Sequence, residues 1–483
     1  MLRRKKTKIV ATLGPATSTK EVLKGMLEEG VDVFRVNFSH ADYADVAERI
    51  KMIRELNDEF GYNAAILGDL QGPKLRVGVM KGEVFVNPGD EIIFATGKKF
   101  EGTKERVYMT YEQFPQDAKP GERILLDDGK LIFEVVSTDK KSEVKARVIQ
   151  GGPLKSKKGV NLPNTNISQP ALTEKDVEDA IFACSQQVDW MALSFVRHAE
   201  DLMQLQELIK QHSDHKIPIV AKIEKPEAVE NIDKIVAYCD GLMVARGDLG
   251  VEIPAQEVPL IQKQLVRCAK KARIPVIIAT QMMETMISSL TPTRAEVNDV
   301  ANSVMDGADA VMLSGETSVG QYPVQVIRQM SDIIKSVEDS PLIKVPQSPP
   351  HIRTKRYITK SICFHAANMA NEINAKAIST LTNSGYTAFQ ISAWRPSAHI
   401  LVFTSNKRIL TQLNLLWGVK AFYYDKFVTT DETIEDVNAL ACEKGYLEEG
   451  DMLISLAAMP IQEKGMVNTL RVSEITDCNL RKK

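Results

Sequence analysis

Apolar residues recur along the first part of the chain in two alternating patterns. A short apolar run at 8–13 is followed by residues at helical spacing, which Ser18 or Thr19 can cap and Gly30 ends. Two more apolar runs, at 31–39 and 63–69, flank a second helical segment. This strand–helix–strand rhythm predicts a parallel sheet covered by helices.

The rhythm stops between residues 73 and 169, where no convincing helical stripe occurs. Short apolar pieces there are separated by turn residues such as Gly82, Gly89, Gly121 and Gly129. Antiparallel strands are predicted at 90–94, 123–126 and 142–148. We therefore expect a separate all-β domain inserted in a loop.

The strand–helix rhythm returns at Thr173, where Thr-Glu-Lys-Asp opens a helix. Further strands are predicted at 188–195, 217–220, 241–244, 275–279 and 308–313. With the first three they make about eight strands, the number in a (β/α)₈ TIM barrel. A doubly wound open sheet is the alternative, but no GxGxxG opens a helix after the first strand, which weighs against a dinucleotide-binding fold.

Prolines concentrate at 340–350, which we interpret as a linker. Beyond it, a helix is predicted at 357–371 and strands at 377–381, 400–403, 419–422 and 451–455. The predicted domains are an α/β barrel at 1–71 and 170–340, the all-β domain at 72–169, and a smaller α/β domain at 352–483.

Composition narrows the class of protein. The chain has 483 residues, 44% apolar and 26% charged, with a formal net charge of −2, typical of a globular protein without general affinity for nucleic acid or membranes. The basic segment 2–8 lacks the apolar region of a signal peptide, and no apolar run reaches membrane-spanning length. The six cysteines are scattered without a CxxC pair, which predicts free thiols, no zinc site and a cytoplasmic location.

In a barrel, functional groups lie at the carboxyl ends of the strands. Nearly every predicted strand end carries polar groups: Arg35, Asn37, Ser39 and His40; Asp69, Lys74 and Arg76; Lys222 and Glu224; Arg246, Gly247 and Asp248; Thr280 and Gln281; Ser314 and Glu316. Lys222 and Glu224 are two residues apart, so they share one face of their strand.

These residue types favour phosphoryl transfer, which needs positioning and charge neutralisation more than a nucleophile. Glu224 and Asp248 can chelate Mg²⁺. Arginine and lysine can neutralise phosphoryl and enolate oxygens. Backbone N–H groups at 247–248 can hold a carboxylate. Two hydroxyls can relay a proton, those of Thr280 and Ser314.

Each assignment has a simpler alternative. Lys222 with Glu224 can be an ordinary surface ion pair, and Arg35 with Asp69 can be a buried pair that closes the barrel. Thr280 can cap a helix. His40 can be a hydrogen-bonded loop residue, and the lysines at 155, 157 and 158 can be a solvated charge run.

Several longer motifs resemble the pyruvate kinase family, in order and over nearly the whole chain. They are KIVATLGP (8–15), RVNFSH (35–40), DLQGPKLR (69–76), KKGVNLP (157–163), IVAKIE (219–224), VARGDLG (244–250), ATQM (279–282) and MLSGET (312–317). The resemblance implies transfer of the phosphoryl group of phosphoenolpyruvate to ADP, giving pyruvate and ATP in glycolysis.

The resemblance also implies roles for individual residues. Lys222 stabilises the transition state and the enolate, Arg35 contacts the phosphoryl group, and Glu224 and Asp248 hold Mg²⁺. Gly247, Asp248 and Thr280 seat the substrate carboxylate, while Thr280 and Ser314 help to deliver a proton. The nucleotide side is lined by Asn37, Ser39, His40, Arg76 and Lys158. The inserted domain resembles the family's mobile lid, which excludes water during the transfer.

Two departures from the family pattern change the expectations. Members that need K⁺ carry an acidic residue where this chain has Lys74, and usually a threonine at the position of Leu70. K⁺ would lie among Asn37, Ser39 and Asp69, and the Lys74 ammonium can supply that charge. We therefore expect activity without K⁺.

The other departure is in the C-terminal domain. The segment 382–387 resembles the loop that holds an effector phosphate, through Thr382, Ser384, Gly385 and Thr387. Two positions that are often basic carry Asn383 and Tyr386, so a phosphate-bearing effector is expected without a specific identity. A minor departure is Ala41, where the family usually has glycine. A homotetramer is implied by the resemblance alone.

Two other hypotheses remain at this stage. One is another Mg²⁺-dependent barrel enzyme acting on pyruvate or phosphoenolpyruvate, such as an aldolase or a mutase, which would not need the inserted domain. The other is a metabolite sensor without catalysis. A sensor would be free to lose Lys222, Glu224 or Asp248, and this chain has all three.

Overall fold

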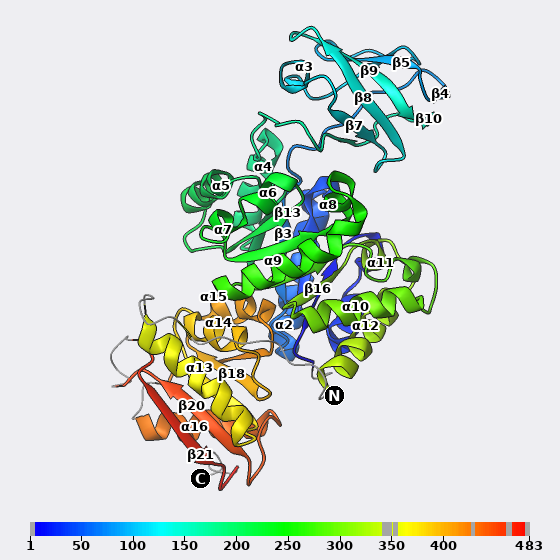
Figure 1. The fold of residues 1–483 in the computed structure, drawn as a ribbon. Helices are drawn as coiled ribbons and strands as arrows, with labels where there is room; N and C mark the ends of the chain where they lie inside the picture. Colours follow the sequence, from blue (N-terminus) through cyan, green and yellow to red (C-terminus); the bar gives the residue numbers. More distant parts are fainter. Residues whose placement is uncertain (1–4, 341–349, 351–355, 427–429, 460–465, 479–483) are drawn as a thin grey trace.

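The computed structural model describes residues 5–340, 350, 356–426, 430–459 and 466–478. Eight parallel strands close into a barrel in the order β1-β16-β15-β14-β13-β12-β3-β2 (Figure 1). They are β1 Lys8–Thr12, β2 Val33–Asn37, β3 Ala65–Asp69, β12 Trp190–Leu193, β13 Ile219–Ile223, β14 Gly241–Ala245, β15 Val276–Ala279 and β16 Ala310–Leu313. The predicted (β/α)₈ barrel is confirmed. The open-sheet alternative is wrong, because β1 pairs with β16 and closes the ring.

Alternate strand residues face opposite sides of the barrel wall. Val10 and Val33 belong to a buried cluster that also contains Leu415 of the C-terminal domain. Their neighbours Ile9 and Phe34 belong instead to the larger core between strands and helices. The strands are therefore buried on both faces, which explains why their sequences are continuous apolar runs without alternation.

Helices surround the barrel: α1 Lys20–Glu29, α2 Tyr43–Phe60, α4 Glu174–Ser185, α5 Ala199–His212, α6 Pro226–Glu230, α7 Ile232–Ile235, α8 Arg246–Glu252, α9 Val258–Ala272, α10 Arg294–Asp306, α11 Gly315–Ser318 and α12 Pro323–Glu338. Helix α1 is capped by Thr19 and ends at Gly30, whose φ is 115°. Thr173 and Asp176 form a reciprocal cap at the start of α4. No helix among the described residues is long and apolar enough to span a bilayer.

The inserted all-β domain, the lid, stands beyond one end of the barrel (Figure 1). Its strands are β4 Val84–Val86, β5 Glu91–Ala95, β6 Arg106–Tyr108, β7 Arg123–Leu126, β8 Leu131–Thr138, β9 Glu143–Gln150, β10 Gly152–Leu154 and β11 Val160–Asn161. They form a six-stranded sheet and a two-stranded ribbon around a separate core. The pairing is antiparallel as predicted, except that β5 and β6 are parallel. One helical turn, α3 Phe114–Asp117, also occurs there.

The C-terminal domain lies at the other end of the barrel (Figure 1). It contains α13 Tyr357–Glu372, β17 Ala377–Leu381, α14 Tyr386–Ala393, β18 His399–Thr404, α15 Lys407–Gln412, β19 Val419–Tyr423, α16 Thr430–Glu443, β20 Met452–Ala457 and β21 Thr469–Glu474. The sheet order is β19-β18-β17-β20-β21. The four predicted strands are present, whereas the antiparallel edge strand β21 was not predicted. Most of the proposed linker lies outside the described residues.

The expectation of six free cysteines is wrong for two of them. Cys442, near the end of α16, forms a disulfide with Cys478, and their Cα atoms are 5.6 Å apart. The physical reason is β21, which brings the chain back along β20 and places Cys478 against the helix. Cys184, Cys239 and Cys363 are buried free thiols, as expected for core residues.

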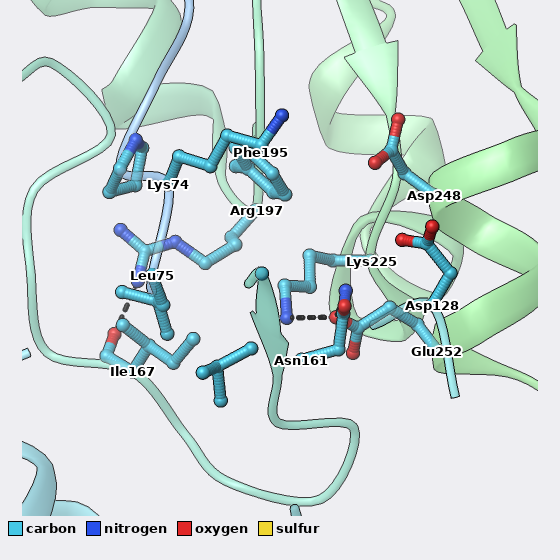
Figure 2. A pocket seen from close by; sticks show the side chains of 13 residues that line it. Lys74, Leu75, Asp128, Asn161, Ile167, Phe195, Arg197, Lys225, Asp248 and Glu252 are labelled. Carbon is cyan, nitrogen blue, oxygen red and sulfur yellow. Dashed lines mark hydrogen bonds and ion pairs between the residues drawn. The ribbon is translucent and has the colours of Figure 1, made fainter. Parts of the chain in front are cut away.

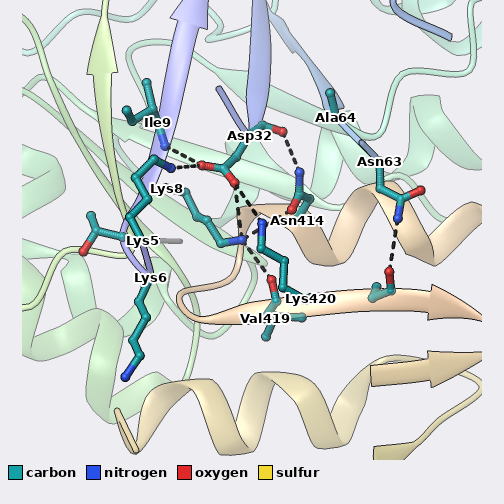
Figure 3. Close-up of polar contacts among 12 residues, drawn as sticks. Lys5, Lys6, Lys8, Ile9, Asp32, Asn63, Ala64, Asn414, Val419 and Lys420 are labelled. Carbon is teal, nitrogen blue, oxygen red and sulfur yellow. Dashed lines mark hydrogen bonds and ion pairs between the residues drawn. The ribbon is translucent and has the colours of Figure 1, made fainter. Parts of the chain in front are cut away.

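A buried charge cluster joins the floor of the barrel to the C-terminal domain (Figure 3). Asp32, just before β2, contacts Lys5 and lies 3.5 Å from the Lys8 ammonium and 3.9 Å from that of Lys420. Lys8 also donates to the Val419 carbonyl over 2.9 Å. Thus the Asp32 carboxylate is the counter-charge for three ammonium groups where the barrel meets the C-terminal domain.

Burial dominates the titration of Lys8, whose side chain is completely inaccessible to solvent. It lowers the pKa of Lys8 to about 7, against the opposing attraction of Asp32. Burial alone would raise the pKa of Asp32, but Lys5, Lys8 and Lys420 outweigh it and hold that pKa well below its usual range. Ionised Asp32 is therefore the group that stabilises this boundary.

Candidate active site

The predicted strand-end residues converge around Lys222, on β13. Its ammonium lies 3.2 Å from Asp69 Oδ1 and 3.0 Å from Glu224 Oε1. Arg35, on β2, donates from Nε to Asp69 Oδ2 over 2.6 Å. All four side chains are buried. The Arg35–Asp69 pair considered as a simpler alternative is present, and it is part of the same cluster as Lys222. Lys222 and Glu224 are not a surface pair.

The cluster keeps Lys222 positively charged. Burial alone would lower the pKa of Lys222, but the Asp69 and Glu224 carboxylates hold it above its ordinary value. Burial alone would likewise raise the pKa of Asp69, but Lys222 and Arg35 hold it below its ordinary value. A permanently charged lysine is suited to neutralise an oxygen that becomes negative during a reaction.

Sequence reasoning missed the residue that orients Lys222. Ser194, just after β12, accepts a hydrogen bond from Lys222 Nζ over 2.6 Å and donates to the Leu70 carbonyl over 2.6 Å. In the sequence, only the position of Ser194 directly after the fourth barrel strand points to a role. The first strand end also contributes, since Arg35 Nη1 donates to Thr12 Oγ1 over 3.1 Å.

A second part of the site lies where β14 and β15 end. Gly247, in the first turn of α8, donates its N–H to Thr280 Oγ1 over 2.6 Å. Thr280 and Gln281 have positive φ angles of 71° and 54°. Arg246 braces this unusual turn through the Thr280 carbonyl (2.7 Å) and Asp299 (2.6 Å). Thr280 is therefore no ordinary helix cap, and such strain is typical of functional sites.

Glu224 and Asp248 are the candidate metal ligands. Burial raises the pKa of Glu224, and the charge of Asp248 adds to this effect against the attraction of Lys222. Two carboxylates that repel each other in this way suit a divalent cation. No group of three or more His, Cys, Asp or Glu ligands occurs among the described residues. This donor set fits Mg²⁺, which commonly takes one or two carboxylates with waters and substrate oxygens.

Ser314 lies between the end of β16 and the first residue of helix α11. Its N–H donates to Glu316 Oε2 over 2.8 Å, and Glu316 Oε1 accepts from the Met283 N–H over 3.1 Å. Glu316 thereby ties the eighth strand end to the seventh. In the described part of the chain no hydrogen bond joins the hydroxyls of Ser314 and Thr280, so the predicted relay is not connected directly.

The residues predicted for a nucleotide lie in three segments of the chain. Asn37 ends β2, and its Oδ1 accepts from the Ser39 N–H over 3.2 Å in the turn that ends at His40. The side chain of His40 is outside what the structure describes. On the lid side, Arg76 donates to the Lys157 carbonyl over 3.0 Å, and Lys158 pairs with Asp127 over 2.8 Å. Lys158 is therefore not part of a purely solvated charge run.

Comparison with known proteins identifies the family. The family model described as "Pyruvate kinase, barrel domain" matches residues 4–327, and "Pyruvate kinase, alpha/beta domain" matches 360–473. The chain belongs to the pyruvate kinase family. A pyruvate kinase of Corynebacterium glutamicum is 42% identical over 473 residues, which cover 98% of each chain. One of Mycobacterium tuberculosis is 41% identical over 97% of this chain and 98% of the relative.

A solved structure gives the same result for the fold. A pyruvate kinase from Cryptosporidium parvum matches with a TM-score of 0.89 at 32% identity, covering 98% of this chain and 96% of that one. The chain is thus a pyruvate kinase by family, an enzyme of the phosphotransferase class, as its resemblance implied. The aldolase, mutase and sensor hypotheses are not supported.

Lys74 is the residue expected to replace K⁺. It is exposed in the segment that leads into the lid and lines a cleft with Asp128, Asp248 and Glu252 (Figure 2). Asp69 pairs with Arg35 and Lys222 instead. The structure therefore does not bring Lys74 onto Asp69, and its replacement of K⁺ stays a prediction.

The candidate effector loop of the C-terminal domain precedes helix α14. Thr382 Oγ1 accepts from the Gly385 N–H over 3.0 Å, and Gly385 has a φ of 78°. Ser384 is exposed, whereas Thr387 is buried within the helix. The first three residues thus form one turn, and Thr387 lies inward from it.

Proposed function

We propose that the chain transfers the phosphoryl group of phosphoenolpyruvate to ADP and releases pyruvate and ATP, as a glycolytic pyruvate kinase. The observation that carries this proposal is the Lys222 cluster: a buried, permanently charged lysine held by Asp69 and Glu224 at the convergent strand ends. Transfer from an enol phosphate leaves negative charge on an oxygen, and a fixed ammonium group stabilises it.

The substrate is proposed to lie among the strand ends. Lys222 and Arg35 neutralise the phosphoryl and enolate oxygens, while the N–H groups of Gly247 and Asp248 and the Thr280 hydroxyl hold the carboxylate. This is supported by the Gly247–Thr280 hydrogen bond of 2.6 Å, which places these two groups side by side; a bound carboxylate would replace Thr280 Oγ1 as the acceptor of the Gly247 N–H. Thr280 and Ser314 then help a proton to reach C3, directly or through water.

Mg²⁺ is proposed to bind Glu224 and Asp248. When bound, this ion supplies positive charge to the substrate oxygens during transfer. Glu224 is oriented for that role by the Phe195 N–H, which donates to its Oε2 over 2.8 Å. The Lys222 ammonium pairs with the other carboxylate oxygen, Oε1, so both oxygens of Glu224 have a partner.

The nucleotide is proposed to lie between the barrel and the lid, on Asn37, Ser39, His40, Arg76 and Lys158. The supporting feature is that these residues come from a barrel strand end and from both chain crossings of the lid. Closing the lid would bring the residues of the barrel and those of the lid together and exclude water.

We also propose the division into a barrel at 1–71 and 170–340, a lid at 72–169 and a regulatory domain at 352–483.

The test is pyruvate production from phosphoenolpyruvate and ADP with Mg²⁺, measured by a coupled assay. Substrate, nucleotide and Mg²⁺ are omitted one at a time. Pyruvate formation that depends on all three would support the proposal, and its absence at micromolar enzyme would overturn it.

Activity is expected to be independent of K⁺. Because Lys74 carries a charge on the segment beside the substrate cleft, replacing K⁺ with Na⁺ at constant ionic strength should change kcat less than twofold. Lys74→Glu should make the enzyme K⁺-requiring, with at least a ~10-fold loss in Na⁺ (about 1.4 kcal/mol), since it puts a negative charge where the positive charge is proposed to act. Exposed Lys81→Glu is the control. A large drop for the unmodified enzyme in Na⁺ would contradict the idea.

Control by a phosphate-bearing effector is proposed for the loop of Thr382, Ser384, Gly385 and Thr387, because its hydroxyls and N–H groups suit a phosphate. Titrating sugar phosphates and nucleotides against the reaction rate tests this proposal, and the absence of any response would contradict it.

A homotetramer and a cytoplasmic location are proposed from the family resemblance. Light scattering tests the homotetramer.

A further inference from the structure

A buried contact ties the lid to the barrel at helix α8. Glu252, the last residue of α8, accepts at Oε1 from Asn161 Nδ2 over 2.8 Å and from Lys225 Nζ over 2.6 Å (Figure 2). Asn161 belongs to the lid strand β11, which pairs with β7. Lys225 follows the barrel strand β13. Three segments from two domains therefore meet on one carboxylate oxygen.

The contact is shielded from water. The side chains of Lys225 and Glu252 are 6% and 0% exposed. The second oxygen, Glu252 Oε2, is also buried and accepts no hydrogen bond from the described residues. Because a buried charge is strongly destabilising without its partners, Glu252 depends on both of its donors. Removing Asn161 leaves the carboxylate with a single donor.

The contact also lies next to the proposed metal ligands. Asp248 precedes Glu252 by four residues, one turn of the same helix. Lys225 directly follows Glu224 in the chain. The Lys225–Glu252 pair therefore bridges the two segments that carry Glu224 and Asp248.

The lid is joined to the barrel by a hinge of two chain segments that are hydrogen-bonded to each other. The chain entering and the chain leaving the lid are bonded to each other, since Val77 donates to the Lys158 carbonyl over 3.0 Å and Val160 to the Leu75 carbonyl over 2.9 Å. Asn161 comes immediately after this double connection. A rotation of the lid must therefore pull on Asn161, and through it on Glu252.

We propose that Asn161, Glu252 and Lys225 are positioning residues that couple the hinge of the lid to the spacing of Glu224 and Asp248. The inference rests on the proposed function, because it gives those carboxylates their role. With the hinge bonded to α8, the two carboxylates are held at the separation that a divalent cation requires. Breaking the bond frees the C-terminal end of α8, one helical turn from Asp248.

The test compares Asn161→Ala with a matched control, Thr165→Val, in the full chain. Each removes one side-chain hydrogen bond to a glutamate, because Thr165 Oγ1 donates to Glu122 over 2.7 Å. Only the first reaches α8. Hydrogen exchange of residues 246–252 is measured without ligands, and Mn²⁺ binding is measured by electron paramagnetic resonance.

For Asn161→Ala, exchange in 246–252 is expected to be ~10-fold faster and Mn²⁺ binding ~5- to 10-fold weaker, as for the loss of one charge-assisted hydrogen bond. Thr165→Val should change neither quantity more than twofold. Glu252→Gln, which keeps the size and the acceptor for Asn161, should weaken Mn²⁺ binding through the lost pair with Lys225.

Equal effects of Asn161→Ala and Thr165→Val would overturn the coupling, as would unchanged exchange in 246–252. Unchanged Mn²⁺ affinity in both Asn161→Ala and Glu252→Gln would show that the Asn161–Glu252–Lys225 contact does not affect the metal ligands. This result would also overturn the coupling. These readouts need no turnover. An enzyme that makes no pyruvate therefore removes the proposed function, whereas an active enzyme with unchanged exchange removes only this inference.

Discussion

Replacing Lys222 with methionine is expected to lower kcat by ~10³-fold, the loss seen when one fixed electrostatic contact to a developing oxyanion is removed. Lys222 is the only ammonium in its cluster of described residues and contacts Asp69, Glu224 and Ser194. Its charge is maintained across the whole neutral range, because both carboxylates hold its pKa above the ordinary value. The loss should fall on kcat and much less on KM, since the charge acts mainly in the transition state.

Two controls separate chemistry from folding. Lys263→Met removes a lysine that pairs with Asp306 on the outer helices α9 and α10, and it should keep nearly full activity. Circular dichroism and the urea midpoint report whether Lys222→Met folds. A folded Lys222→Met enzyme with more than a tenth of the normal kcat would show that this lysine does not stabilise the transition state.

Replacing Asp32 with asparagine is expected to destabilise the chain by ~3–5 kcal/mol, the usual result of removing one partner of a buried ion pair. Lys5 and Lys8 would then lie buried at the barrel floor without a counter-charge. The urea midpoint measures the loss. Adding Lys8→Met should recover part of it, because one unpaired ammonium disappears. Equal midpoints for Asp32→Asn and the unmodified chain would contradict this account.

The stability that ionised Asp32 contributes should decrease as the pH falls. The native-state pKa of Asp32 lies below its ordinary value of 3.8, so between these two values the unfolded chain binds the extra proton. The stability supplied by ionised Asp32 is thus fully present above about pH 4. It is lost as the pH falls through the native-state value. The difference in midpoint between the unmodified chain and Asp32→Asn should therefore shrink in acid.

The barrel was predictable because its strands are buried on both faces and its helices carry clear caps. Runs such as 275–279 have no polar alternation, which only a covered parallel strand explains. The edge strand β21 was not predictable in the same way, because Leu470 and Val472 alternate with residues that suit a loop equally well. Missing β21 also hid the approach of Cys442 to Cys478.

The candidate site was predictable as a set of strand ends but not as a set of contacts. Spacing places Lys222 and Glu224 on one face, yet it cannot show that Asp69 accepts from Arg35 and Lys222 together. Ser194 escaped notice because a lone serine after a strand has no distinctive pattern. The Asn161–Glu252 contact joins residues 91 positions apart in different domains, and neither lies in a strand-end motif.

The pairing of β1 with β16 has a consequence for how the chain is made. Lys8 is the neighbour of Ala310 in the closed ring, so the barrel cannot close until the ribosome has translated about 300 further residues, roughly 15–60 s at ordinary elongation rates. The lid strands pair only among residues 84–161 and can fold during that interval. A newly made chain therefore carries a finished lid on an open barrel, with apolar strand edges that a chaperone would recognise.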